Sequence, residues 1–201
     1  MIITPNFNEE QLWKSFLEGN NDSLEKIYRI YFDELYQYGN KWLNDSNLTE
    51  DVIQDLFIKL MRTRQNLSQT SSIKFYLFRS FKSIALDKIK AEKNTILLDD
   101  YDEKLFQIHL NPENVLIDKQ DYHLIREKLN VAISKLTPRQ REALFLRYNK
   151  GFSYPEVAEM MELTIKGTYK LMARTIEALK ISLASIVCFG CPLDKLMTTI
   201  H

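Results

Sequence analysis

The sequence predicts an all-α protein made of two small helical domains joined by an acidic linker, the second being a helix-turn-helix domain of four helices. Five Gly and five Pro among 201 residues leave little room for a turn-rich β architecture. Apolar residues also recur at intervals of three and four along most of the chain, the period of an amphipathic helix. The domain boundaries that we expect are residues 9–93, a linker at 94–112, residues 113–182, and a tail of unknown role at 183–201.

Charge is distributed in alternating blocks, although the formal net charge of the chain is zero. Residues 9–55 hold 4 basic and 11 acidic side chains (−7), and residues 56–93 hold 9 and 2 (+7). Residues 94–123 hold 2 and 7 (−5), and residues 124–180 hold 11 and 6 (+5). Because salt limits charge effects to roughly 10 Å, two basic surfaces can act locally despite the balanced sum.

The composition is that of a globular protein outside the membrane, with 45% hydrophobic and 27% charged residues. Acidic residues come early in the chain, and the longest apolar run, residues 181–193, is too short to span a bilayer. We therefore expect a cytoplasmic protein.

The tail holds the only two cysteines, Cys188 and Cys191, in a C-x-x-C arrangement. Such a pair serves as half a zinc site or as a redox pair, but further ligands or a strand-helix context would be needed. The three histidines are scattered, and no nucleophile and base share a motif. We expect free thiols, no metal, no cofactor and no enzymatic activity.

Residues 136–180 have the pattern of a helix-turn-helix. Thr137-Pro138 is a favoured helix start, Gly151 is a stop, and Ser153 with Glu156 forms a second capping signal. After Thr164, a further capping candidate, the apolar face of a third helix consists of Ile165, Thr168, Met172, Ile176 and Leu179. Its other faces carry Lys166, Tyr169, Lys170, Arg174 and Lys180. This arrangement suits the major groove of DNA, the alternative being a basic face that is merely solvated.

The N-terminal half predicts four helices. After a short helix at residues 9–19, a long helix begins at Asp22 or Ser23. Its large apolar residues at helical spacing predict core positions, namely Leu24, Ile27, Tyr28, Tyr31, Phe32, Leu35, Tyr38 and Trp42. The third helix is expected to start at Thr49 as N-cap and to have Glu50 and Asp51 in its first turn. Its expected buried positions are Val52, Ile53, Leu56, Phe57, Leu60 and Met61. Asp51, Gln54 and Asp55 share its polar side, where solvated charge is the simplest interpretation.

A polar loop at residues 63–72 precedes a fourth helix, which is capped by Ser71 or Ser72 and runs to about Lys93. Tyr76 lies among cations on the exposed side of that helix, a pattern typical of single-stranded nucleic-acid binding but also of ordinary solvated faces.

Two stretches of this half resemble region 2 of bacterial RNA polymerase sigma factors of the sigma-70 family. TEDVIQDLFIKLMRTR is similar to the pattern E-D-x-x-Q-E-x-F, with Asp55 at the second Glu. KFYLFRSFKSIALDKIK is similar to the DNA-melting helix, with Tyr76 where Trp is typical and Ser83 where Asn is typical. Residues 136–180 resemble region 4, with Gly167-Thr168 where a small polar residue and Val are common. The chain thus resembles the extracytoplasmic-function (ECF) subgroup, which contains only these two regions.

The resemblance implies a transcription initiation factor with core RNA polymerase (clamp coiled coil and flap), promoter DNA and an anti-sigma factor as partners. Polymerase contacts are implied for Asp51, Gln54, Asp55 and Met61. Minus-ten contacts, including a pocket for an extruded base, are implied for Asn66, Gln69, Tyr76, Lys82, Ser83 and Lys90. Minus-thirty-five contacts are implied for Arg147, Tyr154, Lys166, Tyr169, Lys170 and Arg174. The alternative is a stand-alone helix-turn-helix regulator that does not bind polymerase.

Overall fold

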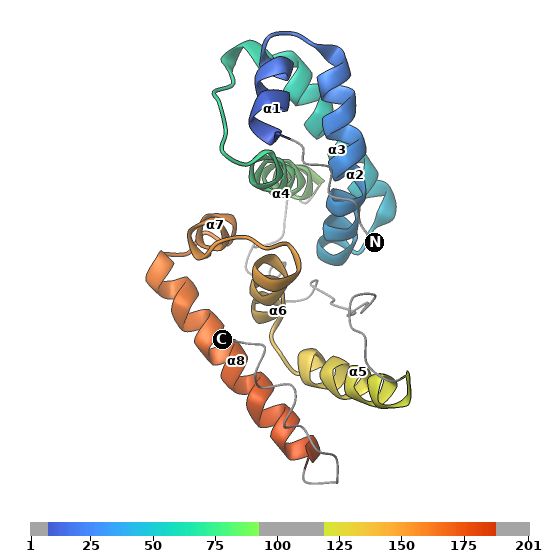
Figure 1. Cartoon of the computed structure of the whole chain (residues 1–201), viewed down its shortest axis with the longest axis vertical. Coiled ribbons are helices and arrows are strands. Elements are labelled where there is room, and N and C mark those ends of the chain that lie inside the picture. The colour runs from blue at the N-terminus through green and yellow to red at the C-terminus, as the bar shows by residue number, and fades with distance from the viewer. Residues whose placement is uncertain (1–7, 93–118, 188–201) are drawn as a thin grey trace. The chain divides into compact units, whose positions relative to one another are not determined.

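The computed structural model describes residues 8–92 and 119–187, and the chain divides into two compact units, residues 1–98 and 99–201 (Figure 1). All the regular elements in these described ranges are helices, which confirms the predicted all-α class. The linker at residues 94–112 and the cysteines of the tail, Cys188 and Cys191, lie outside the described residues.

The first unit consists of α1 (Glu9–Leu17), α2 (Asn21–Leu43), α3 (Ser46–Thr63), the 3-10 turn η1 (Arg64–Asn66) and α4 (Ile73–Glu92). Helix α2 packs along α3, and α4 packs against α3, α2 and α1. The fully buried side chains of its core include Trp13, Phe16, Ile27, Leu35, Tyr38, Ile53, Leu56, Leu60, Leu77, Phe78 and Phe81.

Two helices of this unit begin earlier than the sequence predicted. Asn20, rather than Asp22 or Ser23, caps α2, and its side chain accepts from the backbone N–H groups of Asp22 and Ser23. Asp45 caps α3 by accepting from Leu48 N, so Thr49 lies inside the helix, and its hydroxyl donates to Asp45 O at 2.6 Å. Glu50 and Asp51 consequently lie beyond the first turn of α3, contrary to our expectation.

Helix α2 approaches α3 and α4 most closely at Gly39. A Cβ atom at this position would come closer than 3.0 Å to the side chains of Thr49 and Phe81. Thr49 and Phe81 are both fully buried, so neither side chain lies at the surface. The absence of a side chain at Gly39 therefore sets how closely the three helices pack.

The second unit consists of α5 (Lys119–Ser134), α6 (Pro138–Leu144), the π-helical turn η3 (Phe145–Asn149), α7 (Tyr154–Met160) and α8 (Ile165–Val187). Helix α8 contacts α5, α6 and α7. The predicted capping box of Ser153 with Glu156 is confirmed, and so is Thr137 as the N-cap of α6; Thr137 also forms a capping box with Gln140, which was not predicted. Thr164 begins α8 by accepting from Gly167 N at 3.0 Å, also as predicted.

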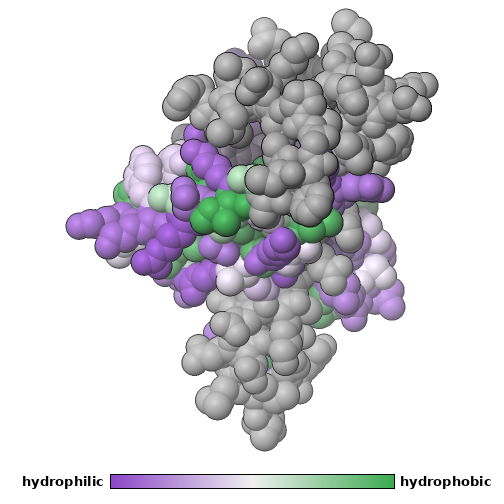
Figure 2. Space-filling view, turned by 90° about the horizontal axis from the view of Figure 1, so that it is seen from below, coloured by the Kyte–Doolittle hydropathy of each residue, from purple (hydrophilic) through white to green (hydrophobic). Residues whose placement is uncertain are grey.

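Among the described residues, no helix is long and apolar enough to cross a membrane. On the face shown in Figure 2, hydrophilic side chains project outward and hydrophobic ones gather between them.

Candidate polymerase and promoter interfaces

An open groove of about 560 Å³ lies between α2 and α3. Its lining residues are Leu24, Tyr28, Phe32, Glu50, Ile53, Gln54, Phe57, Ile58 and Met61. Tyr28 and Phe32 are one turn apart with ring centroids separated by 5.1 Å, and Tyr28 meets Phe57 edge-on at 4.9 Å. The prediction that Tyr28 belongs to the core was wrong, since the side chain is 40% exposed. The apolar stripe of α2 is wider than the surface that α3 can cover. Tyr28 therefore remains at the surface, where its ring lines the groove.

Two residues with an implied polymerase contact, Gln54 and Met61, line this groove. Met61 is 54% exposed, so the expectation that α3 buries it was wrong. Its position near the C-terminal end of α3 places it at the rim of the core, with groove space on one side. Asp51 is exposed on the same helix.

Asp55, the remaining residue of this set, forms an ion pair with Lys88 of α4, with 2.7 Å between Oδ2 and Nζ. A second pair, Lys74 to Glu34 at 2.9 Å, joins α4 to α2. Both pairs are partly exposed, so each contributes no more than about 1 kcal/mol to stability. Their effect on α4 is to hold its orientation against the groove-bearing helices.

The side chains with an implied role in holding an extruded base lie at the end of η1 (Asn66) and in the loop that follows it (Gln69). Asn66 and Gln69 are exposed, while the loop backbone is held by α1: the indole N–H of Trp13 donates to Ser68 O at 2.9 Å. Ser72 ends the loop as the cap of α4, since its hydroxyl accepts from Phe75 N at 3.1 Å. The loop thus presents amides to solvent from a backbone that is fixed on its other side.

The predicted minus-ten residues of α4 differ in exposure. Ser83 and Lys90 are exposed, whereas Tyr76 and Lys82 are half-buried. The ring of Tyr76 packs against Trp13 with centroids 5.1 Å apart, and Lys82 Nζ lies 5.5 Å from the centroid of a Trp42 ring. Tyr76 therefore offers at most one edge or face to a base, and its orientation depends on α1.

In the second unit the structure brings together Arg147, Tyr154 and Tyr169, which come from three consecutive elements. The rings of Tyr154 and Tyr169 stack with centroids 4.2 Å apart and an interplanar angle of 19°. The guanidinium of Arg147 lies 5.0 Å from the Tyr154 ring centroid and donates to Phe152 O at 2.9 Å. Through this stack, side chains of η3, α7 and α8 contact one another within the helix-turn-helix region.

The predicted outer face of α8 is confirmed as exposed at all five positions, Lys166, Tyr169, Lys170, Arg174 and Lys180. Its inner face differs from the prediction at Ile165, which is 50% exposed because it begins the helix before the first buried position. Thr168, Met172 and Thr175 are the buried residues of this face. The hydroxyls of both threonines donate to carbonyls one turn back, to Thr164 O and Leu171 O, so their burial leaves no unpaired donor.

Sequence reasoning missed Tyr28 and Phe32 as lining residues of the groove, Trp13 as a contact of the loop, and Glu9 as a contact of the first residue of α4. The sequence did contain a signal for Tyr28 and Phe32, because eight large apolar positions on one helix are more than the neighbouring helices can cover. Trp13 and Glu9 contact residues that are 55 and 64 positions away in the sequence, and no local pattern predicts contacts at such separations. No group of three potential metal ligands occurs within the part of the chain that the structure describes.

Comparison with known proteins supports the same division of the chain. The family model for "Sigma-70 region 2" matches residues 27–95, and the model for "Sigma-70, region 4" matches residues 126–179. The ECF RNA polymerase sigma factor SigM of Bacillus subtilis is 25% identical over 159 residues, which are 79% of this chain and 93% of SigM. The ECF sigma factor SigW of the same organism is 22% identical over 176 residues, 83% of this chain and 92% of SigW.

Solved structures show the same fold. The sigma factor RpoE of Bartonella quintana, in complex with the anti-sigma factor NepR, has a TM-score of 0.55 and 19% identity over 81% of this chain and 98% of that one. CnrH in complex with the cytosolic domain of CnrY has a TM-score of 0.55 and 16% identity over 90% and 98%.

The chain belongs to the ECF subgroup of the sigma-70 family, since its two regions, their order and its relatives all agree. It is a non-enzymatic transcription initiation factor that binds core RNA polymerase and directs it to promoters. This excludes a stand-alone regulator that functions without polymerase.

Proposed function

We propose that the groove between α2 and α3 is the docking site for the clamp coiled coil of the polymerase. The groove offers aromatic surface beside Gln54 and Met61, with Glu50 lining it and Asp51 exposed on the same helix. A helical partner with an apolar side chain and nearby cations fits such a surface in shape and charge. Asp55 contributes from the edge and also holds Lys88 in place.

The segment of residues 63–72, which comprises η1 and the loop before α4, receives an extruded base of the non-template strand at the minus-ten element. Asn66 and Gln69 supply amide donors and acceptors for the edge of the base. Extrusion costs a few kcal/mol, which polar contacts in the loop offset. Tyr76, Lys82, Ser83 and Lys90 follow along α4 and hold the separated strand by stacking and charge.

Helix α8 reads the minus-thirty-five element in the major groove through Lys166, Tyr169, Lys170 and Arg174. Tyr154 stacks on Tyr169 and so sets the direction of its ring, while Arg147 supports Tyr154 from behind. The same unit contacts the polymerase flap. The minus-ten and minus-thirty-five contacts both require the chromosome and the polymerase. The proposal therefore includes a cytoplasmic location for the protein.

An anti-sigma factor is a further partner, because RpoE, a protein of this fold, was solved in complex with the anti-sigma factor NepR. The open groove is the surface that such a partner would cover to prevent polymerase binding. The observation that carries the proposed assignment is this groove, since a protein that binds only duplex DNA has no use for it.

The test is run-off transcription with purified core polymerase on a promoter library randomised at both elements. The double variant Asp51→Ala with Gln54→Ala is expected to lose core affinity and transcription while retaining duplex DNA binding. Lys170→Ala is the complementary variant, expected to retain core affinity and lose minus-thirty-five preference. Full core affinity in the double variant would refute the docking assignment.

A further inference from the structure

Helix α1 and Gly19, two residues beyond its end, contact the segment that runs from η1 through the loop to the first residue of α4. Arg64 lies beside Gly19 at one end, the indole of Trp13 reaches Ser68 in the middle, and Glu9 reaches Ile73 at the other end. The order of contacts is antiparallel: residue numbers fall along α1 as they rise along the loop.

The Trp13 contact fixes the loop backbone rather than a side chain. Trp13 is fully buried, and its only polar atom donates to the carbonyl oxygen of Ser68 at 2.9 Å. Loss of that donor would leave a carbonyl without its partner and free the loop at its centre. The same indole packs against Tyr76 with centroids 5.1 Å apart, so one side chain orients both the loop and the first aromatic residue of α4.

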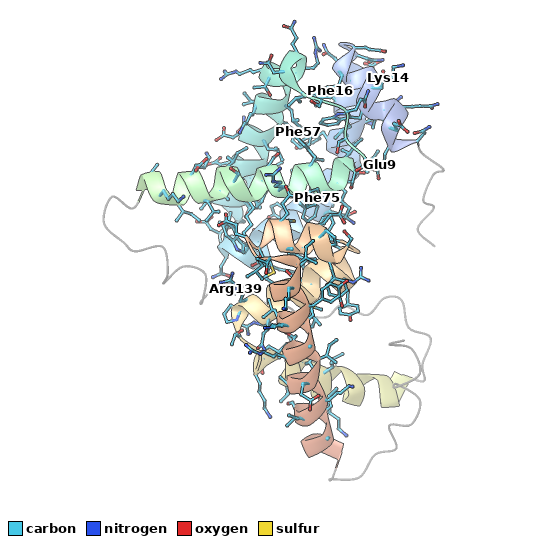
Figure 3. All side chains as sticks on the ribbon, turned by 90° about the vertical axis from the view of Figure 1, so that its left-hand side faces the viewer. Glu9, Lys14, Phe16, Phe57, Phe75 and Arg139 are labelled. Carbon is cyan, nitrogen blue, oxygen red and sulfur yellow. The ribbon has the colours of Figure 1, made fainter. Side chains whose placement is uncertain are left out.

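The Glu9 contact fixes the start of α4. Its Oε2 accepts from Ile73 N at 3.1 Å, one of the N–H groups that the first turn of a helix leaves unpaired. A carboxylate at a helix N-terminus also interacts favourably with the helix dipole. Figure 3 shows Glu9 beside this end of α4.

Glu9 is itself held from α2, since the Tyr31 hydroxyl donates to its carboxylate. Burial raises the pKa of Tyr31, and the hydrogen bond to Glu9 raises it further. Three helices thus meet at one carboxylate, and its position is determined by the fold rather than by solvent.

We propose that α1 is the positioning element of the minus-ten pocket, with Trp13 and Glu9 as its positioning residues. The loop has few hydrogen bonds of its own, among them Leu67 N to Arg64 O and the bonds between Thr70 and Ser72. A pocket for an extruded base discriminates only when its amides are held in place before binding. By holding the backbone from behind, α1 leaves Asn66 and Gln69 exposed to read the base. This inference rests on the proposed function of the loop.

The test measures base preference at each promoter position with core polymerase and the full chain. Trp13→Phe keeps an aromatic ring and removes the donor, and it is expected to reduce preference at the minus-ten element about three- to tenfold. Preference at the minus-thirty-five element and core affinity are expected to remain unchanged. Glu9→Ala is expected to act in the same way, whereas Glu9→Gln, which keeps an acceptor oxygen, restores most of the preference.

Tyr38→Phe is the matched control, because it likewise keeps an aromatic ring and removes its polar group at a fully buried position of the same unit, where the ring packs on Phe78 and Phe81. Thermal unfolding of each variant separates loss of folding from loss of discrimination. A uniform loss over all promoters that follows the folded fraction, or an unchanged minus-ten preference in Trp13→Phe, would overturn the inference. A wild-type protein without any minus-ten preference would instead refute the proposed loop function, and the inference with it.

Discussion

Truncation of Met61 tests the docking groove, because this side chain lines it and is already 54% exposed in the free protein. Full burial of a Met side chain is worth about 1.5–3 kcal/mol. If polymerase covers the exposed half, Met61→Ala should cost about 0.8–1.6 kcal/mol of binding free energy. That corresponds to core affinity about four- to fifteenfold weaker, measured by titration of labelled protein with core polymerase.

Ile30→Ala is the matched control for this variant, since Ile30 is 41% exposed on α2 and does not line the groove. We expect this control to bind core polymerase as the wild type does, with little change in the unfolding free energy of either variant. Unchanged affinity in Met61→Ala together with weaker binding in Ile30→Ala would show that polymerase docks on another face.

Further predictions concern the packing of the first unit and the DNA contacts of the second. Gly39→Ala should lower the unfolding free energy in urea by about 1–2 kcal/mol, because overpacking at the helix crossing outweighs the better helix propensity of Ala; unchanged stability would contradict this. Lys170→Ala should reduce the slope of log affinity against log salt by about 0.9 if its ammonium meets a phosphate, whereas Lys180→Ala on the same helix should leave the slope unchanged. Ser153→Ala removes a capping box and should destabilise the second unit by about 1 kcal/mol in thermal unfolding, with minus-thirty-five binding weakened alongside it.

Local chemistry was the part of the fold that the sequence predicted well. The N-cap at Thr137 and the capping box of Ser153 with Glu156 were both predicted, because each interaction involves residues no more than three apart. The start of α3 was misplaced because Thr49 and Asp45 are both acceptable caps, and only the packing of Thr49 beside Gly39 decides between them.

Surface features that depend on tertiary packing were harder to predict. Periodicity identified Tyr28 as apolar and helical, but it does not tell which part of a wide stripe a neighbouring helix covers. Asp55 was expected on a polar face, and its pairing with Lys88 appears only once α4 lies against α3. The contacts of Trp13 with Ser68 and of Glu9 with Ile73 join distant segments and were not predictable from spacing.

The most direct test of the whole account is site-specific photo-crosslinking in initiation complexes assembled with core polymerase. A photoreactive residue in place of Gln69 should crosslink to the non-template strand within the minus-ten element, and only when polymerase is present. One in place of Lys170 should crosslink to duplex DNA at the minus-thirty-five element in the same complexes. Crosslinks from position 69 to duplex DNA without polymerase, or none to DNA at all, would contradict the assignment of two separate promoter contacts.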